Sequence, residues 1–193
     1  MGTVTLAHPK TNSRQQVIVG KRVILRSPNL RDADEFLNLN LQSRSFHRGL
    51  ASPPKTLADY SAFLARAAKQ DSEVFLICLK SDSAIAGSIN LSQIFHGTFQ
   101  NAYLGYFIGL PFANQGYMTE AIQLILRYAF RKLKLHRIEA NIQPANAASL
   151  CLVRRAGFRR EGYSPRYLKI CGRWRDHERW AITLEDWHSR RRK

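Results

Sequence analysis

The segment Leu110-Pro-Phe-Ala-Asn-Gln-Gly-Tyr-Met-Thr-Glu120 joins an apolar run that ends near Gly109 to an amphipathic pattern of helical period. The spacing of apolar residues predicts a strand, a turn at Gly116 and a long helix over Thr119–Leu133. The first amide N–H groups of a helix lack partners within it and lie at the positive end of its dipole. Such a turn can bind a phosphate group. Many strand-to-helix turns contain glycine, however, and a turn with Thr119 as a plain cap needs no ligand.

A second helix start follows about 30 residues later, in the segment Pro144-Ala-Asn-Ala-Ala-Ser-Leu150. Asn146 is a good N-cap for a helix over Ala147–Ala156, and Gly157 is a good residue to end it. Ser149 lies within the first turn of this helix, where its hydroxyl can face a ligand. Taken alone, the segment is equally compatible with a plain cap and a small polar surface residue.

The remaining pattern predicts one α+β domain over residues 17–188, between a flexible arm at 1–16 and a basic tail at 189–193. A mixed, mostly antiparallel sheet with helices on both faces accounts for the order of elements. The expected elements are a strand or hairpin at 17–25, helices at 30–41 and 56–69, strands at 74–80, 85–94, 102–108, 137–142 and 158–163, and a hairpin of 168–170 and 174–183 that turns at Cys171-Gly172-Arg173.

Charge is the strongest compositional signal: the chain has 30 Lys and Arg but only 14 Asp and Glu, which gives a net charge of +16. A field of this sign attracts anions such as nucleic acid, the ribosome or a phosphorylated cofactor. A solvated basic surface is the simpler explanation. No apolar stretch is long enough for a membrane span or a secretory signal, so we expect a cytoplasmic protein. Three cysteines without ligand spacing predict free thiols, with Cys78 and Cys151 near the core, and no metal site.

Together, the two helix starts and the strands around them resemble the core of the GNAT acetyltransferase superfamily. The closer resemblance is to its RimJ/RimL branch, which acetylates N-terminal amines of ribosomal proteins, and to RimJ-type enzymes in particular. It covers about the last hundred residues and is loose in the N-terminal half. The matching motifs are Gly97-Thr-Phe99, Tyr103-Leu-Gly-Tyr106, Gly116-Tyr-Met-Thr-Glu-Ala121, Leu135-His-Arg-Ile138, Pro144-Ala-Asn-Ala-Ala-Ser149, Arg155-Ala-Gly-Phe158, Glu161-Gly-Tyr163 and Gly172-Arg-Trp-Arg-Asp-His177.

This resemblance implies a six- to seven-stranded GNAT fold in which two parallel strands, at 106–108 and 137–142, splay apart in a V. Acetyl-CoA, as co-substrate, would place its pantetheine arm between them and its pyrophosphate on the Gly116 turn. Asn146 would bind the arm or an ordered water, and Ser149 would stabilise or protonate the leaving thiolate. The implied cofactor-binding residues are Tyr106, Phe107, Ile108, Asn114, Gln115, Gly116, Tyr117, Met118, Thr119, Asn146 and Ser149.

The turn departs from the superfamily pattern, Arg/Gln-x-x-Gly-x-Gly/Ala, at two positions. Pro111 replaces the first residue, which puts the usual side-chain contact there in doubt. Asn114 replaces the first glycine, and since Asn tolerates left-handed backbone better than most residues, the turn can still form. Ser149 occupies the position at which many members of the superfamily have a tyrosine that acts as the general acid. A thiolate leaves easily, so the weaker acid is tolerable.

The implied reaction is direct attack of a neutral amine on the thioester, in which the enzyme chiefly positions both reactants. An α-amine, with a pKa of about 7.7–8.0, is partly neutral near pH 7, whereas lysine at about 10.4 needs a stronger base. This difference favours a protein N-terminus, such as that of a ribosomal protein, as the acceptor. Glu139 and His177 are the candidates for the base, each with a structural alternative: an ion pair for Glu139 and a hydrogen bond within the sheet for His177.

Three other functions stay open on the sequence alone. The basic charge and the aromatic residues near Arg166, Arg173 and Arg175 also suit an RNA surface, as a main function or as a secondary contact with the ribosome. The acceptor can be a small amine, such as an antibiotic, a polyamine or an amino acid. The chain can also be an inactive CoA binder. We expect the segments 43–56 and 96–101 to decide the acceptor.

Overall fold

The computed structural model describes residues 16–190, so the expected arm at 1–16 lies almost wholly outside the described residues. The same holds for most of the expected tail, of which Ser189 and Arg190 form the end of a helix. Eight strands form a single sheet in the order β1-β2-β3-β4-β5-β6-β8-β7, in which β5 and β6 pair in parallel and all other neighbours are antiparallel.

The elements follow the chain in a simple order. They are β1 (Val17–Val19), β2 (Val23–Arg26), a 3-10 turn η1 (Leu30–Asp32), α1 (Ala33–Gln42), α2 (Leu57–Ala67), β3 (Glu73–Leu79), β4 (Ile85–Phe95), β5 (Asn101–Ile108), a 3-10 turn η2 (Leu110–Phe112), α3 (Tyr117–Arg131), β6 (Arg137–Ile142), α4 (Ala147–Ala156), β7 (Arg159–Ile170), β8 (Arg173–Thr183) and α5 (Leu184–Arg190).

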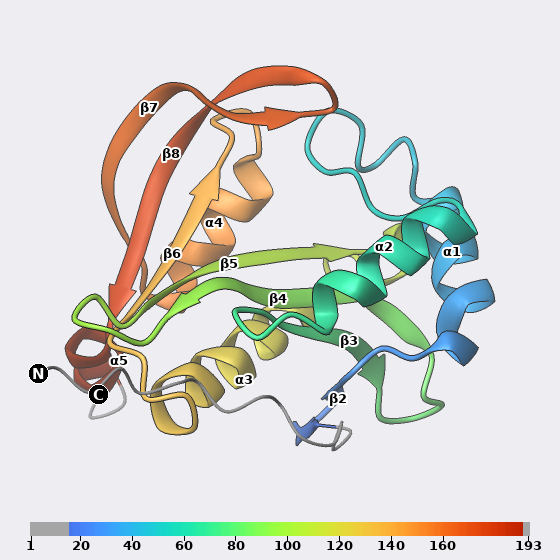
Figure 1. Ribbon diagram of the computed structural model, residues 1–193, viewed down its shortest axis with the longest axis horizontal. Helices are drawn as coiled ribbons and strands as arrows, with labels where there is room; N and C mark the ends of the chain where they lie inside the picture. Colours follow the sequence, from blue (N-terminus) through green and yellow to red (C-terminus); the bar gives the residue numbers. More distant parts are fainter. Residues whose placement is uncertain (1–15, 191–193) are drawn as a thin grey trace, which may run out of the picture.

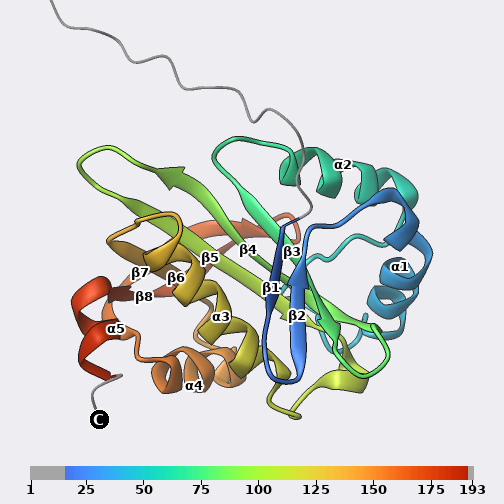
Figure 2. The same cartoon turned by 90° about the horizontal axis from the view of Figure 1, so that it is seen from below.

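Helices cover the sheet on both sides, as the pattern of elements predicts. Helices α1 and α2 lie over one face, and α3 and α4 lie over the other (Figures 1 and 2). The larger core lies between the sheet and α3, and includes Ile122 and Ile125; the smaller lies under α1 and α2, and includes Phe36 and Tyr60. All seven residues of β3 are buried, because a strand with helices on both faces has no solvent side.

The parallel pair β5 and β6 separates soon after it forms. Asn101–Tyr103 pair with Arg137–Glu139, and no pairing between the two strands follows along their remaining described length. Strand β5 instead stays on β4 as far as Ile108, and β6 stays on β8 as far as Ile142. The divergence that we expected of these strands is therefore present, and it leaves one side of each without a neighbouring strand.

The structure corrects several sequence expectations. Helix α3 begins at Tyr117, two residues before Thr119, because Gly116 caps it in a left-handed conformation with φ 82°. The strands expected at 158–163 and 168–170 are one strand, β7, whose register shifts around Pro165; an edge strand tolerates proline at a bulge. The sheet has eight strands rather than six or seven, and α5 was not expected. Cys151 is exposed rather than near the core.

Candidate active site

A cleft of about 470 Å³ opens where β5 and β6 diverge. Its walls come from β5, from the turn before α3, from the first turns of α3 and α4, and from the loop between α1 and α2. The lining residues are Phe46, His47, Leu50, Ala51, Tyr106, Phe107, Ile108, Phe112, Ala113, Asn114, Gly116, Tyr117, Met118, Thr119, Asn146, Ala148, Ser149, Cys151, Leu152 and Arg155. Of the expected cofactor-binding residues, all but Gln115 line this cleft. No residue of 96–101 does.

The main chain of β5 presents alternate residues to the cleft. The Gly109 amide donates to Ala86 of β4 at 2.8 Å, so in an antiparallel ladder the N–H and C=O groups of Phe107 also face β4. Those of Tyr106 and Ile108 point the other way, toward the side that β6 has left. Tyr106 therefore offers its N–H and C=O to a ligand, and Ile108 offers its N–H, because its carbonyl accepts from His47. Phe107 contributes its ring, which packs on Phe36 of α1.

The turn before α3 exposes a set of amides. Asn114 and Gly116 are both left-handed, with φ 59° and 82°, so asparagine at the first of these positions is compatible with the turn, as expected. The first hydrogen bond of α3 runs from the Glu120 amide to the Gly116 carbonyl. No side chain caps the helix. The amides of residues 117–119 are thus available to an anion at the positive end of the helix.

Arg22, in the β1–β2 turn, adds a cation beside these amides. Its guanidinium donates to the Gln115 carbonyl at 2.9 Å and lies 4.2 Å from the centre of the Tyr117 ring. The Glu120 carboxylate accepts from the Arg22 amide at 2.9 Å, which fixes the turn on α3. Sequence reasoning missed Arg22 because it lies about 90 residues away along the chain, and only the β1–β2 hairpin brings it here.

Helix α4 points its first turn at the cleft. Its start and end confirm the sequence prediction, since Asn146 accepts from the Ser149 amide at 3.1 Å and Gly157 is left-handed with φ 102°. Tyr106 of β5 has a buried hydroxyl without a well-formed hydrogen bond. Burial raises the pKa of Tyr106 to about 12, and the neighbouring Ser149 hydroxyl lowers it by less. A protonated phenol therefore stands beside Ser149.

Glu139 and His177 do not line the cleft. Both lie on the sheet face opposite α4, where Glu139 pairs with Arg137 at 2.8 Å and is 13% exposed. His177 is buried and donates from Nδ1 to the Arg175 carbonyl at 2.9 Å. Glu139 lies opposite Ala181, four residues along β8 from His177, so the structure does not bring the two candidates together. Glu139 thus has the ion pair, and His177 the hydrogen bond within the sheet, that were the structural alternatives to a catalytic role.

The loop between α1 and α2 lies across the end of the cleft where β5 and β6 have diverged. On one side, His47 Nε2 donates to the Ile108 carbonyl at 2.8 Å. On the other, Gln143 Nε2, just after β6, donates to the Gly49 carbonyl at 2.9 Å. The loop is thereby tied to both diverging strands and closes the cleft at the end where β5 finishes. The loop thus lines the cleft, and its role in acceptor choice stays a prediction.

His47 should make folding stability sensitive to mildly acidic pH. Burial lowers its pKa below the ordinary value of 6.5. Between the lowered and the ordinary pKa, the unfolded chain binds more protons than the folded one, so stability falls as pH drops below about 6.5. We expect the Tm of the wild type to fall more between pH 7.5 and pH 5.5 than that of His47→Gln, which keeps a donor for Ile108. Equal falls in thermal scans would show that His47 is not responsible.

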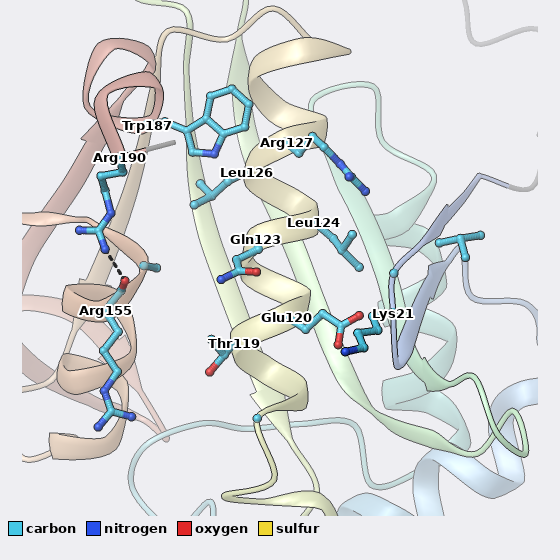
Figure 3. A pocket seen from close by; sticks show the side chains of 14 residues that line it. Lys21, Thr119, Glu120, Gln123, Leu124, Leu126, Arg127, Arg155, Trp187 and Arg190 are labelled. Carbon is cyan, nitrogen blue, oxygen red and sulfur yellow. Dashed lines mark hydrogen bonds between the residues drawn. The ribbon is translucent and has the colours of Figure 1, made fainter. Parts of the chain in front are cut away.

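A second hollow, a groove of about 850 Å³, runs along α3 (Figure 3). Lys21 and Arg127 lie on one side of it, and Arg155 and Arg190 lie on the other. Arg190 also donates to the Arg155 carbonyl at 2.8 Å, which links α5 to α4. Gly116, Thr119 and Arg155 line both this groove and the cleft, so the two hollows are neighbours around the start of α3.

Several known proteins are similar to this chain in sequence or in fold. Residues 22–159 match the family model "Acetyltransferase (GNAT) domain". The probable N-acetyltransferase YjcK of Bacillus subtilis is 34% identical, over 88% of this chain and 98% of its own. The [ribosomal protein uS5]-alanine N-acetyltransferase of Escherichia coli is 43% identical, but over only 55% of each chain. The structure of Mycobacterium smegmatis RimJ in complex with CoA-disulfide superimposes with a TM-score of 0.81 over 90% of each chain, at 27% identity.

The family match begins at Arg22 and covers β2, both diverging strands, and the starts of α3 and α4. The expected fold and enzyme class are therefore confirmed. The chain is an acyltransferase that belongs to the GNAT acetyltransferase family, and its relatives place it in the RimJ/RimL branch.

Proposed function

We propose that this acetyltransferase moves the acetyl group of acetyl-CoA to the α-amine of a protein N-terminus in the cytoplasm, with ribosomal proteins as the first candidates. The proposal rests on two features that occur together at the cleft. Strand β5 has no neighbouring strand along the cleft, and α3 offers free amides at its start. A thin amide-containing arm with a diphosphate head fits this combination. The basic groove beside it suits a phosphorylated nucleoside end.

In the proposed reaction, the amine nitrogen bonds to the acetyl carbon and the carbon–sulfur bond breaks. An α-amine that is an ammonium first gives one proton to solvent, and the neutral amine then attacks. The nitrogen, positively charged once the bond has formed, loses a second proton, and the departing thiolate gains one, so the step from neutral amine to amide and thiol balances. The Ile108 N–H, which faces the cleft, is the proposed donor to the developing oxyanion. Ser149 donates to the thiolate, and the protonated phenol of Tyr106 stands behind it. An α-amine is partly neutral near pH 7, so solvent can take its proton; Glu139 and His177 are candidates only for relaying it.

Ser149→Ala tests the proposed role of the hydroxyl. We expect kcat to fall by about 10-fold to 100-fold, at the low end of what a positioned proton donor contributes, with the KM for acetyl-CoA nearly unchanged. Steady-state thiol release measures both. Cys151→Ala is the matched control, because it alters an exposed side chain of the same helix that also lines the cleft. An unchanged kcat in Ser149→Ala would remove this residue from the mechanism.

The acceptor is tested by thiol release with a panel of amines. A peptide that starts with Ala or Ser should be acetylated at its α-amine, as mass spectrometry of the product shows. The same peptide with a blocked N-terminus and a free lysine should not be. Mass spectrometry of ribosomal proteins from cells with and without the gene then identifies the natural target. Faster turnover of small amines than of any peptide would contradict the proposal. A small-molecule amine is the alternative acceptor, and the family match alone is compatible with it.

A further inference from the structure

Two segments beside the cleft carry positive charge and no negative charge. Residues 43–56, the loop between α1 and α2, contain Arg44, Arg48 and Lys55. Residues 164–175, the outer half of the β7–β8 hairpin, contain Arg166, Lys169, Arg173 and Arg175. All 14 Asp and Glu of the chain lie outside these two segments. We refer to these seven cations as the cationic rim.

The two segments of the cationic rim meet in space. Ser52 Oγ of the loop and Cys171 Sγ at the hairpin tip lie 3.1 Å apart. The hairpin curves away from the rest of the sheet and reaches over to this loop (Figure 1). The loop itself lines the cleft through Phe46, His47 and Leu50. An acceptor that approaches between the loop and the hairpin therefore passes close to the rim.

The cations of the rim outnumber the carboxylates beside them. Arg44, Arg48, Arg166, Lys169 and Arg173 are exposed. Among residues 16–190, no ion pair involves any of the seven. Two carboxylates flank the rim and keep their negative charge, because their hydrogen bonds come from neutral groups, so seven cations stand against two anions. Asp176 accepts from the Tyr163 hydroxyl and the Arg166 amide, and Asp59 accepts from the amides of Lys55 and Thr56.

We infer that the preferred acceptor is a polypeptide N-terminus whose following residues are acidic. The inference rests on the proposed function, and it narrows the substrate class. A local field of one sign raises the encounter rate of ligands of the opposite sign by about 10-fold to 1,000-fold. The same field disfavours polyamines and lysine-rich peptides. An extended chain rises about 3.3 Å per residue, so several acidic residues behind the amine can reach the rim at once.

Two matched peptides test the preference. Both start with Ala and have the same length, and they differ only in carrying Glu or Lys at four positions after the second residue. At low ionic strength, we expect kcat/KM for the acidic peptide to exceed that of the basic one by about 10-fold or more. The ratio should shrink as salt rises, because exposed charges are screened. An equal or higher kcat/KM for the basic peptide at low salt would overturn the inference.

A charge-reversal variant links the preference to the rim. Arg166→Glu, Lys169→Glu and Arg173→Glu together should abolish or reverse the ratio, while the KM for acetyl-CoA stays constant. The control combines Arg66→Glu, Lys80→Glu and Lys132→Glu, three exposed cations outside the rim that change the net charge equally. A control that moves the ratio as much as the rim variant would show a general charge effect and would sink the assignment.

Three outcomes separate this inference from an RNA-binding role and from the proposed function. If the rim variant loses binding to a single-stranded RNA oligonucleotide and keeps the peptide ratio, the rim serves RNA and the inference is overturned. If neither peptide is acetylated while a small primary amine is, the proposed function fails, and the inference fails with it. If both peptides are acetylated equally, the proposed function stands and this inference alone is lost.

Discussion

Replacing Gly87 with alanine is expected to lower kcat/KM by about 100-fold, the scale that a misplacement of about 1 Å costs in positioning. Gly87 lies opposite Ile108 in the β4–β5 ladder. A Cβ atom there would meet the Phe107 carbonyl oxygen at 2.3 Å and Ile108 Cα at 2.9 Å. Both are backbone atoms, so no side chain can rotate away and β5 must move. The Ile108 N–H would then leave the position proposed for the oxyanion donor.

Comparing the binding of CoA with that of a fragment of CoA tests whether the damage is confined to the pantetheine site. Gly87→Ala should weaken CoA binding in calorimetry, yet leave unchanged the affinity for adenosine 3′,5′-bisphosphate, which lacks the pantetheine arm. Overpacking by about 1–3 kcal/mol should also lower Tm by roughly 5 °C. Gly105→Ala, on β5 itself, is the control, since the three atoms nearest to its Cβ would all belong to the Asn90 side chain, the closest at 2.8 Å. Equal losses for CoA and for the bisphosphate would show that the damage is not local to β5.

The second large effect is expected from Gly116→Val. Gly116 holds φ at 82°, a region in which a β-branched residue is strained by about 1–2 kcal/mol. Relief of that strain requires the start of α3 to rotate, which turns the amides of residues 117–119 away from the anion. We expect the Kd for CoA to rise at least about 10-fold, or ~1.4 kcal/mol. Here the affinity for the bisphosphate should fall as well, in contrast to Gly87→Ala.

Gly172→Val provides the matched control for backbone strain. Gly172 has nearly the same backbone angle, φ 78°, and a Cβ there would meet no atom within 4 Å. Its place at the hairpin tip is remote from α3, so it should lose stability without losing affinity for CoA. If calorimetry shows the same loss of CoA affinity in both variants, the helix start is not the anion site. Binding that persists in Gly116→Val would lead to the same conclusion.

Local patterns in the sequence were sufficient for the individual elements. The Asn146 cap and the left-handed Gly157 are both found where the residue types predicted them, and a capping box of Thr56 and Asp59 starts the helix expected from residue 56. Each depends on hydrogen bonds or backbone angles within four residues along the chain, so tertiary context hardly alters them. The start of α3 was misplaced by two residues, because Thr119 resembles a cap and the left-handed capacity of Gly116 was assigned to the turn instead.

The sequence alone determined a basic single-domain α+β protein, the alternation that makes each strand and helix, and the motifs that resemble an acetyltransferase core. The net charge of +16 follows from the composition, but the places of the charges on the surface do not. Only the tertiary structure decided that Arg22 lies at the start of α3, that His47 and Gln143 tie a loop across the diverging strands, and that residues 43–56 and 164–175 form one cationic rim. Hydrogen bonds within a turn follow from neighbouring residues, whereas contacts across 61 to 119 residues depend on how the whole sheet packs.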